Sequence, residues 1–455
     1  QSVTRLLLGH FRQPLQVGHI PQYVTHLSLS AFNQPLQVGH IPQSVKHLSF
    51  SAFNQPLQVG HIPQSVTHLL LAHFNQPLQV GHIPQSVTLL SLSDFDQPLQ
   101  VGHIPPTVKH LSFSVFNQPL QVGHIPQSVT HLSMNCYGRE GPALLHVGDI
   151  PQSVTSLSLR DYSQPLQIGH IPQSVTHLSF QCYDHPLQIG HIPQSVTHLS
   201  FQCYDQPLQV GHIPQSVTQL SLDYFNHPLQ IGHIPQSVTH LLFHCYDQPL
   251  QVGHIPQSVT QLSLECYDQP LQIGHIPQSV TQLSLDSLRQ PLQIGHIPQS
   301  VTHLSFSAFN QPLQVGHIPQ SVIHIAFGDS FNQTLTPGHI PSASSLSIAF
   351  AQFISSKNCL FEHKKRKNSI ILPTKMSRIS HLITQIISKY PPYKTLHQND
   401  DDVLFYLLHA LERIQTITVQ FHTYQQSDFH EDSIWRRIDD KVALVVHDKK
   451  ASFWT

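Results

Sequence analysis

One segment of about 21 residues returns along most of the chain, and it limits the fold more than any other feature. A typical copy reads FNQPLQVGHIPQSVKHLSFSA, and the glycine of its Gly-His-Ile-Pro segment recurs from Gly18 to Gly338, mostly in steps of 21 residues. Two prolines in each copy exclude an α-helix, because proline cannot donate a helical hydrogen bond. We therefore predict a mainly β solenoid of about 15–16 coils with 21–22 residues each.

Each copy contains one short strand with a buried face. Leu27 and Leu29 alternate with His26 and Ser28, which is the period of a β-strand. Burying the apolar side chains of one coil contributes about 2 kcal/mol each, whereas ordering the coil costs about 1.5 kcal/mol per residue. One coil is therefore unstable alone, and stacked coils must share one parallel sheet. The apolar positions expected in the core of one coil are Val24, Leu27, Leu29, Phe32, Leu36, Val38 and Ile41.

The residues that follow the repeats differ in charge from the repeats. Residues 1–350 hold 7 Lys and Arg against 13 Asp and Glu, whereas residues 351–455 hold 15 against 11. We predict a repeat solenoid at 1–350, a basic linker at 351–375, and a small α+β domain at 376–455 that caps the last coil. Within this domain the apolar spacing predicts helices at 376–389 and 403–414, a strand at 417–421, and a hairpin of 435–438 with 442–446.

The repeat resembles a known family. Leu-x-Leu strands preceded by an apolar residue resemble leucine-rich repeats, and F-N-x-P-L followed by G-x-I-P-x-S-V-x-x-L is similar to the FNIP repeat family. Most copies are one residue shorter than that family's usual repeat, and the copy that ends at Gly338 has the full length. The resemblance implies a leucine-rich-repeat-like fold and protein binding, without an established activity. Some members carry an F-box, which implies a substrate adaptor in ubiquitin ligation, and no F-box pattern is apparent here.

Histidine recurs at two positions of the repeat, each of which we call a column when the copies are aligned. Fifteen histidines precede Ile-Pro, as His19 and His40 do, and ten lie on the strands, as His26 and His47 do. A row of imidazoles suggests a series of metal-binding sites along the strands, but zinc needs about four ligands that converge on one point. We interpret the histidines as a solvated polar face, with a response to pH as the alternative. No metal and no cofactor are predicted.

Other recurring residues have structural interpretations. Asn33 and its equivalents follow the aromatic residue of each coil, where an amide can bond the backbone of the turn after the strand. Five of the six cysteines share one column without a CxxC pair, and we interpret them as reduced thiols. The four extra residues within 135–142 are interpreted as a surface loop. No Ser-His-Asp arrangement and no phosphate loop can be singled out, so we predict no enzyme.

Targeting signals are few. The sequence contains no run of about 18 apolar residues, and QSVTRLLLGH lacks the charged start and cleavage site of a signal peptide. This start lies inside a repeat, which suggests a fragment or an unusual start. The basic run Lys364-Lys365-Arg366-Lys367 is a candidate nuclear localisation signal or nucleic-acid contact. We predict a cytoplasmic protein without a membrane span, with nuclear entry as the alternative and no nucleic-acid partner.

The stretch after each strand varies strongly between copies. Repeat positions with the same residue in most copies stabilise the fold, whereas the side chain at a position that differs between copies is free to recognise a partner. Midway along the repeats this stretch gains acids, and tyrosine replaces the usual phenylalanine. Acids beside aromatic hydroxyls suit a basic segment of a partner protein; alternatively, tyrosine fills the phenylalanine position and the acids maintain solubility. The candidate protein-binding residues are Asp161, Asp184, Asp205, Asp223, Asp247, Glu265, Asp268, Tyr183, Tyr204, Tyr246 and Tyr267.

Three functions are compatible with these patterns. The first is a non-enzymatic protein–protein interaction scaffold that uses an elongated repeat surface. The second is a substrate adaptor in ubiquitin ligation or signalling. The third is an activity within the C-terminal domain, where the sequence shows no recognisable catalytic constellation. The partner protein is not identified by the sequence.

Overall fold

The computed structural model describes residues 3–138, 144–288, 290–328, 330–331, 333 and 338–341, together with the backbone of six strands between 345 and 454. The chain divides into two compact units, Gln1–His227 and Pro228–Thr455. This division lies inside the repeats, and the predicted domain boundary after residue 350 stays a prediction. The predicted linker at 351–375, the helix at 403–414 and residues 139–143 of the predicted loop lie outside the described residues.

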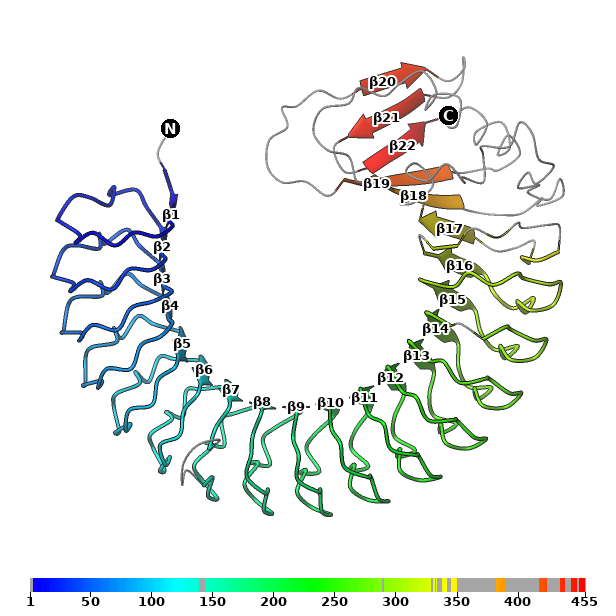
Figure 1. Cartoon of the computed structure of the whole chain (residues 1–455), viewed down its shortest axis with the longest axis horizontal. Coiled ribbons are helices and arrows are strands. Elements are labelled where there is room, and N and C mark those ends of the chain that lie inside the picture. The colour runs from blue at the N-terminus through cyan, green and yellow to red at the C-terminus, as the bar shows by residue number, and fades with distance from the viewer. Residues whose placement is uncertain are drawn as a thin grey trace. The chain divides into compact units, whose positions relative to one another are not determined.

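The first unit is built from short strands, one in each repeat. Each strand pairs in parallel with the strand of the next repeat, from β1 with β2 to β10 with β11. Successive coils lie side by side (Figure 1), which confirms the predicted solenoid with one parallel sheet. The strands are β1 (Arg5–Leu8), β2 (His26–Leu29), β3 (His47–Phe50), β4 (His68–Leu71), β5 (Leu89–Ser93), β6 (His110–Ser114), β7 (His131–Asn135), β8 (Ser156–Arg160), β9 (His177–Gln181), β10 (His198–Gln202) and β11 (Gln219–Asp223).

The second unit continues the same pattern and ends in a different one. Strands β12 to β19 pair in parallel in chain order, and β20, β21 and β22 form antiparallel pairs, with β22 also antiparallel to β19. The repeat strands are β12 (His240–His244), β13 (Gln261–Glu265), β14 (Gln282–Asp286), β15 (His303–Phe306), β16 (His324–Phe327) and β17 (Ser345–Ala349). The later strands are β18 (Leu382–Ser388), β19 (Ile417–Thr423), β20 (Ile434–Arg437), β21 (Ala443–His447) and β22 (Lys450–Trp454).

The core of each unit follows the predicted alternation. In β3, Leu48 and Phe50 are buried, whereas His47 is half-buried. The parallel register places Leu48 beside Leu69 of the next coil, so equivalent side chains form continuous rows through the unit. The aromatic residue that follows the strand continues the core, since the ring centroids of Phe53 and Phe74 lie 6.2 Å apart. Each row therefore supplies the neighbours that a single coil lacks.

One expected core position is wrong. Val38 is 68% exposed, and the Val or Ile at the same place in the other described coils is exposed as well. Gly39 follows it with φ +88°, in a turn that directs Val38 outward over the next coil. A Cβ atom on Gly60 would lie 3.4 Å from Cγ2 of Val38. This valine therefore covers the backbone of the neighbouring coil instead of entering the core.

The end of the chain corrects a second expectation. The apolar spacing of 376–389 predicted a helix, but the structure contains β18 at Leu382–Ser388. Its sequence LITQIIS is rich in β-branched residues, which favour strands, and a short apolar run has an ambiguous period. The predicted strand at 417–421 lies within β19. The predicted hairpin is present as β20 and β21, which pair antiparallel.

Candidate functional site

In thirteen of the described coils, the residue one or two positions after the strand has a backbone conformation that side chains rarely adopt. Its φ lies near +55°, as at Ala31, Cys203 and Cys266. This left-handed turn aims the backbone N–H at the next coil: Cys203 N donates to Asp223 O at 2.9 Å. The backbone thus has a fixed role here, while the side chain is free to differ. The residues of this post-strand position are His10, Ala31, His73, Asp94, Val115, Cys136, Asp161, Cys182, Cys203, Tyr224, Cys245, Cys266 and Ser287.

The four tyrosines proposed for partner binding lie in the core, so this part of the prediction is wrong. All four side chains are at most 1% exposed: Tyr183, Tyr204, Tyr246 and Tyr267. Each hydroxyl accepts a hydrogen bond from a leucine N–H of the preceding coil, at 2.9–3.1 Å. Burial raises their pKa values, that of Tyr204 to about 12. The alternative interpretation, in which tyrosine fills the phenylalanine position, is the one that the structure supports.

The seven candidate acids differ in exposure. Asp184, Asp205 and Asp247 are exposed, and the other four are half-buried. The Asp205 side chain is 85% exposed, with its Oδ1 3.2 Å from Nε2 of His227. Within the described part of the chain, the carboxylates of Asp184 and Asp247 accept no hydrogen bond. These three aspartates are therefore available to a partner in their own units.

The half-buried acids interact with their surroundings. Asp161 accepts a hydrogen bond from the thiol of Cys136 at 3.6 Å, and its Oδ2 lies 3.5 Å from Nε of Arg160. Asp223 accepts from Ser221 Oγ at 2.7 Å, and Glu265 accepts from Ser263 Oγ at 3.2 Å. Asp268 accepts at its backbone carbonyl from Gln290 Nε2 at 3.1 Å.

The column that holds the exposed aspartates has a structural role in other coils. Asn33 Oδ1 accepts a hydrogen bond from Asn54 N at 2.9 Å, and Asn54 Oδ1 accepts from Asn75 N at 2.9 Å. The predicted amide-to-backbone bond therefore exists, but it reaches the next coil instead of its own turn. Asp96 does the same for Asn117 N at 2.8 Å. In Asp184 and Asp247, which follow tyrosines, the carboxylate does not make this bond.

The histidines before Ile-Pro are not the solvated face that the sequence predicted. His191 and His212 are 4% and 5% exposed, and their equivalents from His40 to His317 are buried too. Their Nδ1 atoms accept the backbone N–H of the glutamine three residues earlier, at 3.2 Å for His191. Burial lowers the pKa of His191 and of most of this column. This imidazole is an acceptor that closes a turn.

Asp149 replaces histidine in one coil and preserves the contact. Its Oδ2 accepts the backbone N–H of His146 at 2.7 Å. An oxygen therefore serves where the other coils place a ring nitrogen.

The strand histidines form stacked pairs on a half-exposed surface. The ring centroids of His26 and His47 lie 4.2 Å apart, and those of His177 and His198 lie 4.1 Å apart. Nδ1 of His26 lies 2.9 Å from Oγ1 of Thr25. Flat stacking does not direct ring nitrogens at a common point, which is the geometry that a metal ion needs.

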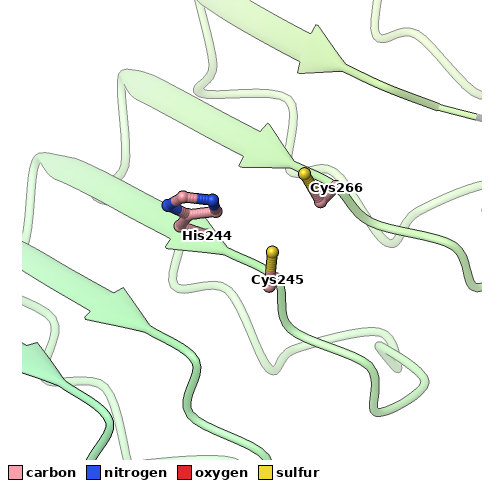
Figure 2. Close-up of side chains that lie close together, drawn as sticks. All are labelled: His244, Cys245 and Cys266. Carbon is pink, nitrogen blue, oxygen red and sulfur yellow. The ribbon is translucent and has the colours of Figure 1, made fainter.

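Sequence reasoning missed one cluster of potential ligands. His244 at the end of β12 lies beside Cys245 and Cys266, and their ligand atoms are all within 4.8 Å of one another (Figure 2). The sequence signal was available: His244 immediately precedes a cysteine whose equivalent in the next coil is also a cysteine.

Comparison with known proteins agrees with this architecture. The FNIP Repeat family model matches residues 11–52, 53–95, 95–137, 144–183, 162–204, 183–225, 204–246, 225–267, 246–286, 267–308 and 309–349. The chain is similar to CroV588, a protein whose crystal structure is described as a novel circular LRR protein structure, with a TM-score of 0.58 and 23% identity over 91% of this chain. It spans 65% of the length of that protein, and the likeness shows a leucine-rich-repeat-like fold.

A second solved structure is less similar. The TLR13–ssRNA13 complex matches with a TM-score of 0.48 and 13% identity, over 88% of this chain and 71% of that one. No curated protein sequence gives a significant match. Within the described residues, no helix has the length and apolar character needed to cross a bilayer.

Proposed function

The chain belongs to the FNIP repeat family, and from this premise we propose that it is a non-enzymatic protein-interaction scaffold whose exposed aspartates bind a basic segment of a partner protein. The exposed carboxylates of Asp184 and Asp205 in the first unit carry this proposal, and Asp247 offers a separate exposed carboxylate in the second unit. The carboxylates of Asp184 and Asp247 accept no hydrogen bond within the described residues, and that of Asp205 is 85% exposed beside His227. Such carboxylates can accept hydrogen bonds from lysine or arginine, and bonds between charged groups are stronger than neutral ones.

The identity of the neighbouring residues supports the same role. Each exposed aspartate directly follows a tyrosine whose hydroxyl holds the preceding coil. In coils with phenylalanine, the next residue is usually an asparagine that bonds to the following coil, as Asn33 does. In the described coils that contain the exposed aspartates, the tyrosine makes its hydrogen bond, and the aspartate after it thus does not bond to the backbone N–H of the following coil as Asn33 does. We infer that this leaves the carboxylate for recognition.

Catalysis is not part of the proposed function. The recurring Ser and His side chains of the return path have identified structural partners: Ser195 Oγ donates to Val175 O at 2.8 Å, and His191 Nδ1 accepts from Gln188 N at 3.2 Å. Groups that are engaged in this way do not form a nucleophile with an adjacent base.

Capture of peptides by the immobilised full chain tests this proposal. The probe is a library of short peptides in which Lys and Arg content varies at constant length. We expect peptides with clustered Lys or Arg to be enriched at low salt and to be released as the salt concentration rises, because exposed charge pairs are screened. Enrichment of peptides without regard to basic residues, or retention that ignores salt, would contradict the proposed recognition.

A further inference from the structure

The second unit contains a cluster of one imidazole and two thiols that the acidic surface does not use. His244 is the last residue of β12, Cys245 follows it, and Cys266 occupies the same post-strand position one coil later. Their ligand atoms all lie within 4.8 Å of one another. The side chains gather at the carboxyl ends of neighbouring strands (Figure 2). We propose that His244, Cys245 and Cys266 bind a thiophilic cation, with Zn²⁺ as the ligand.

The separation of the three atoms suits one metal ion. Bonds of about 2.3 Å to sulfur and about 2.0 Å to nitrogen place the ligand atoms of a tetrahedral zinc site about 3.5–4 Å apart. The observed limit of 4.8 Å exceeds this by about 1 Å, which rotation of short side chains about χ1 can close.

The backbone of both cysteines is held in position. Cys245 and Cys266 have φ of 53° and 55°. Cys245 N donates to Glu265 O at 2.8 Å, and Cys266 N donates to Asp286 O at 2.9 Å. These bonds to the next coil fix the direction of both Cα–Cβ vectors before any ion binds. Such preorganisation lowers the cost of forming the site.

The donor atoms select the class of ion. Thiolate and imidazole prefer Zn²⁺ and similar soft or borderline cations, whereas Mg²⁺ and Ca²⁺ prefer oxygen. Three protein ligands leave one position for water, as in open zinc sites. Glu265 lies beside His244 in the register of β12 and β13, and its negative charge favours a cation nearby. Cys266 is exposed, so an ion can reach the cluster from solvent.

The chain contains its own control for this site. Cys182 and Cys203 occupy the same two positions in a pair of neighbouring coils. The residues before them are Gln181 and Gln202, so an imidazole is missing from that pair. Two thiols without histidine should therefore bind Zn²⁺ more weakly.

Titration of the metal-free, reduced full chain with Co²⁺ tests the proposal, because thiolate bound to Co²⁺ gives a sulfur-to-metal charge-transfer band. We expect one equivalent of Co²⁺ to produce this band and Zn²⁺ to displace it. Cys245→Ser with Cys266→Ser should abolish the band. His244→Gln should weaken Co²⁺ binding at least tenfold, whereas Cys182→Ser with Cys203→Ser should leave it unchanged.

The substitutions are compatible with the fold. Ser287 already occupies the post-strand position with φ 57°, and Gln202 already ends a strand at the position of His244. An absent band would overturn the proposal. A band that survives loss of Cys245 and Cys266, that is unchanged in His244→Gln, or that disappears with Cys182 and Cys203 would overturn it too.

A second measurement uses the unaltered chain. Zn²⁺ should slow alkylation of Cys245 and Cys266, measured by mass spectrometry of peptides, while the rates at Cys182 and Cys203 stay the same. Equal alkylation rates at Cys245 and Cys266 with and without Zn²⁺ would contradict the assignment, even if a variant failed to fold.

Discussion

At the scale of single residues, a tyrosine hydroxyl adds a hydrogen bond to a core position that phenylalanine fills in other coils. Tyr204 and Phe225 occupy equivalent positions, and both are fully buried. The hydroxyl of Tyr204 accepts the backbone N–H of Leu187 at 3.0 Å. The corresponding hydroxyl of Tyr162 is buried without a hydrogen-bond partner in the described residues, although the backbone of Leu145 lies near enough to influence its pKa.

This difference gives a paired prediction. Tyr204→Phe should lower the free energy of unfolding by about 1 kcal/mol, because the buried N–H of Leu187 loses its acceptor. Tyr162→Phe should cost less than Tyr204→Phe or should stabilise the chain, since its hydroxyl is buried without compensation. Thermal unfolding of both variants beside the unaltered chain measures the contrast. An equal loss in the two variants would show that the hydroxyl bond is not what distinguishes them.

At the scale of the coil, side chains as well as strands hold neighbours together. The Oδ1 atom of Asn54 accepts two bonds from the next coil, from Asn75 N at 2.9 Å and from Gln76 Nε2 at 3.1 Å. Ser65 Oγ donates to Val45 O at 2.8 Å. These bonds link adjacent coils at places where the strands do not reach.

Substitution of Asn54 tests the contribution of such a link. Asn54→Ala should destabilise the chain by about 1 kcal/mol, because a backbone N–H and an amide lose one acceptor. Asn54→Asp is the matched control and should be tolerated, since Asp96 makes the same bond to Asn117 N. Chemical unfolding of both variants provides the comparison. If alanine were as stable as aspartate at this position, the link would be dispensable.

The period of the repeat explains which parts of the fold were predictable. Alternation in segments such as HLSF predicts the strand and its buried face, and the structure has both. In the proline-containing segment between strands, no regular alternation of apolar and polar residues indicates which side chains are buried. The outward turn of Val38 and the burial of His191 were missed for this reason. Variation between copies pointed to seven acids, of which three are exposed, whereas the exposure of each acid and the burial of the tyrosines depend on the packing of neighbouring coils.

At the scale of the whole molecule, many copies of one buried histidine make stability depend on pH. Burial lowers the pKa of twelve histidines that precede Ile-Pro. They are His40, His61, His82, His103, His124, His170, His191, His233, His254, His275, His296 and His317. Protonation of Nδ1 would also remove the acceptor of the turn. In the unfolded chain these groups titrate near 6.5.

Acidification should therefore unfold the chain. Stability should be fully present above about pH 6.5 and should fall as the pH drops from there toward the lowered pKa of the folded state, because the unfolded chain binds more protons in this window. The melting temperature measured between pH 8 and pH 5 checks the direction.

A triple variant isolates the histidine contribution. His170→Asn, His191→Asn and His233→Asn keep an acceptor but do not titrate, as the carboxylate oxygen of Asp149 shows that oxygen serves in this turn. The variant should lose less stability on acidification than the unaltered chain. Identical dependence on pH in both chains would assign the effect to other groups.

If exposed aspartates recognise a basic segment, the affinity for a captured basic peptide should depend on them, and matched variants measure this dependence. Asp184→Asn with Asp205→Asn should weaken binding several-fold, since exposed charge pairs contribute about 0.2–1 kcal/mol each. Asp94→Asn with Asp96→Asn removes the same charge from the same unit and should leave the affinity nearly unchanged. Equal weakening in both double variants would mean that net charge alone attracts the peptide, and unchanged affinity in the first would place recognition elsewhere.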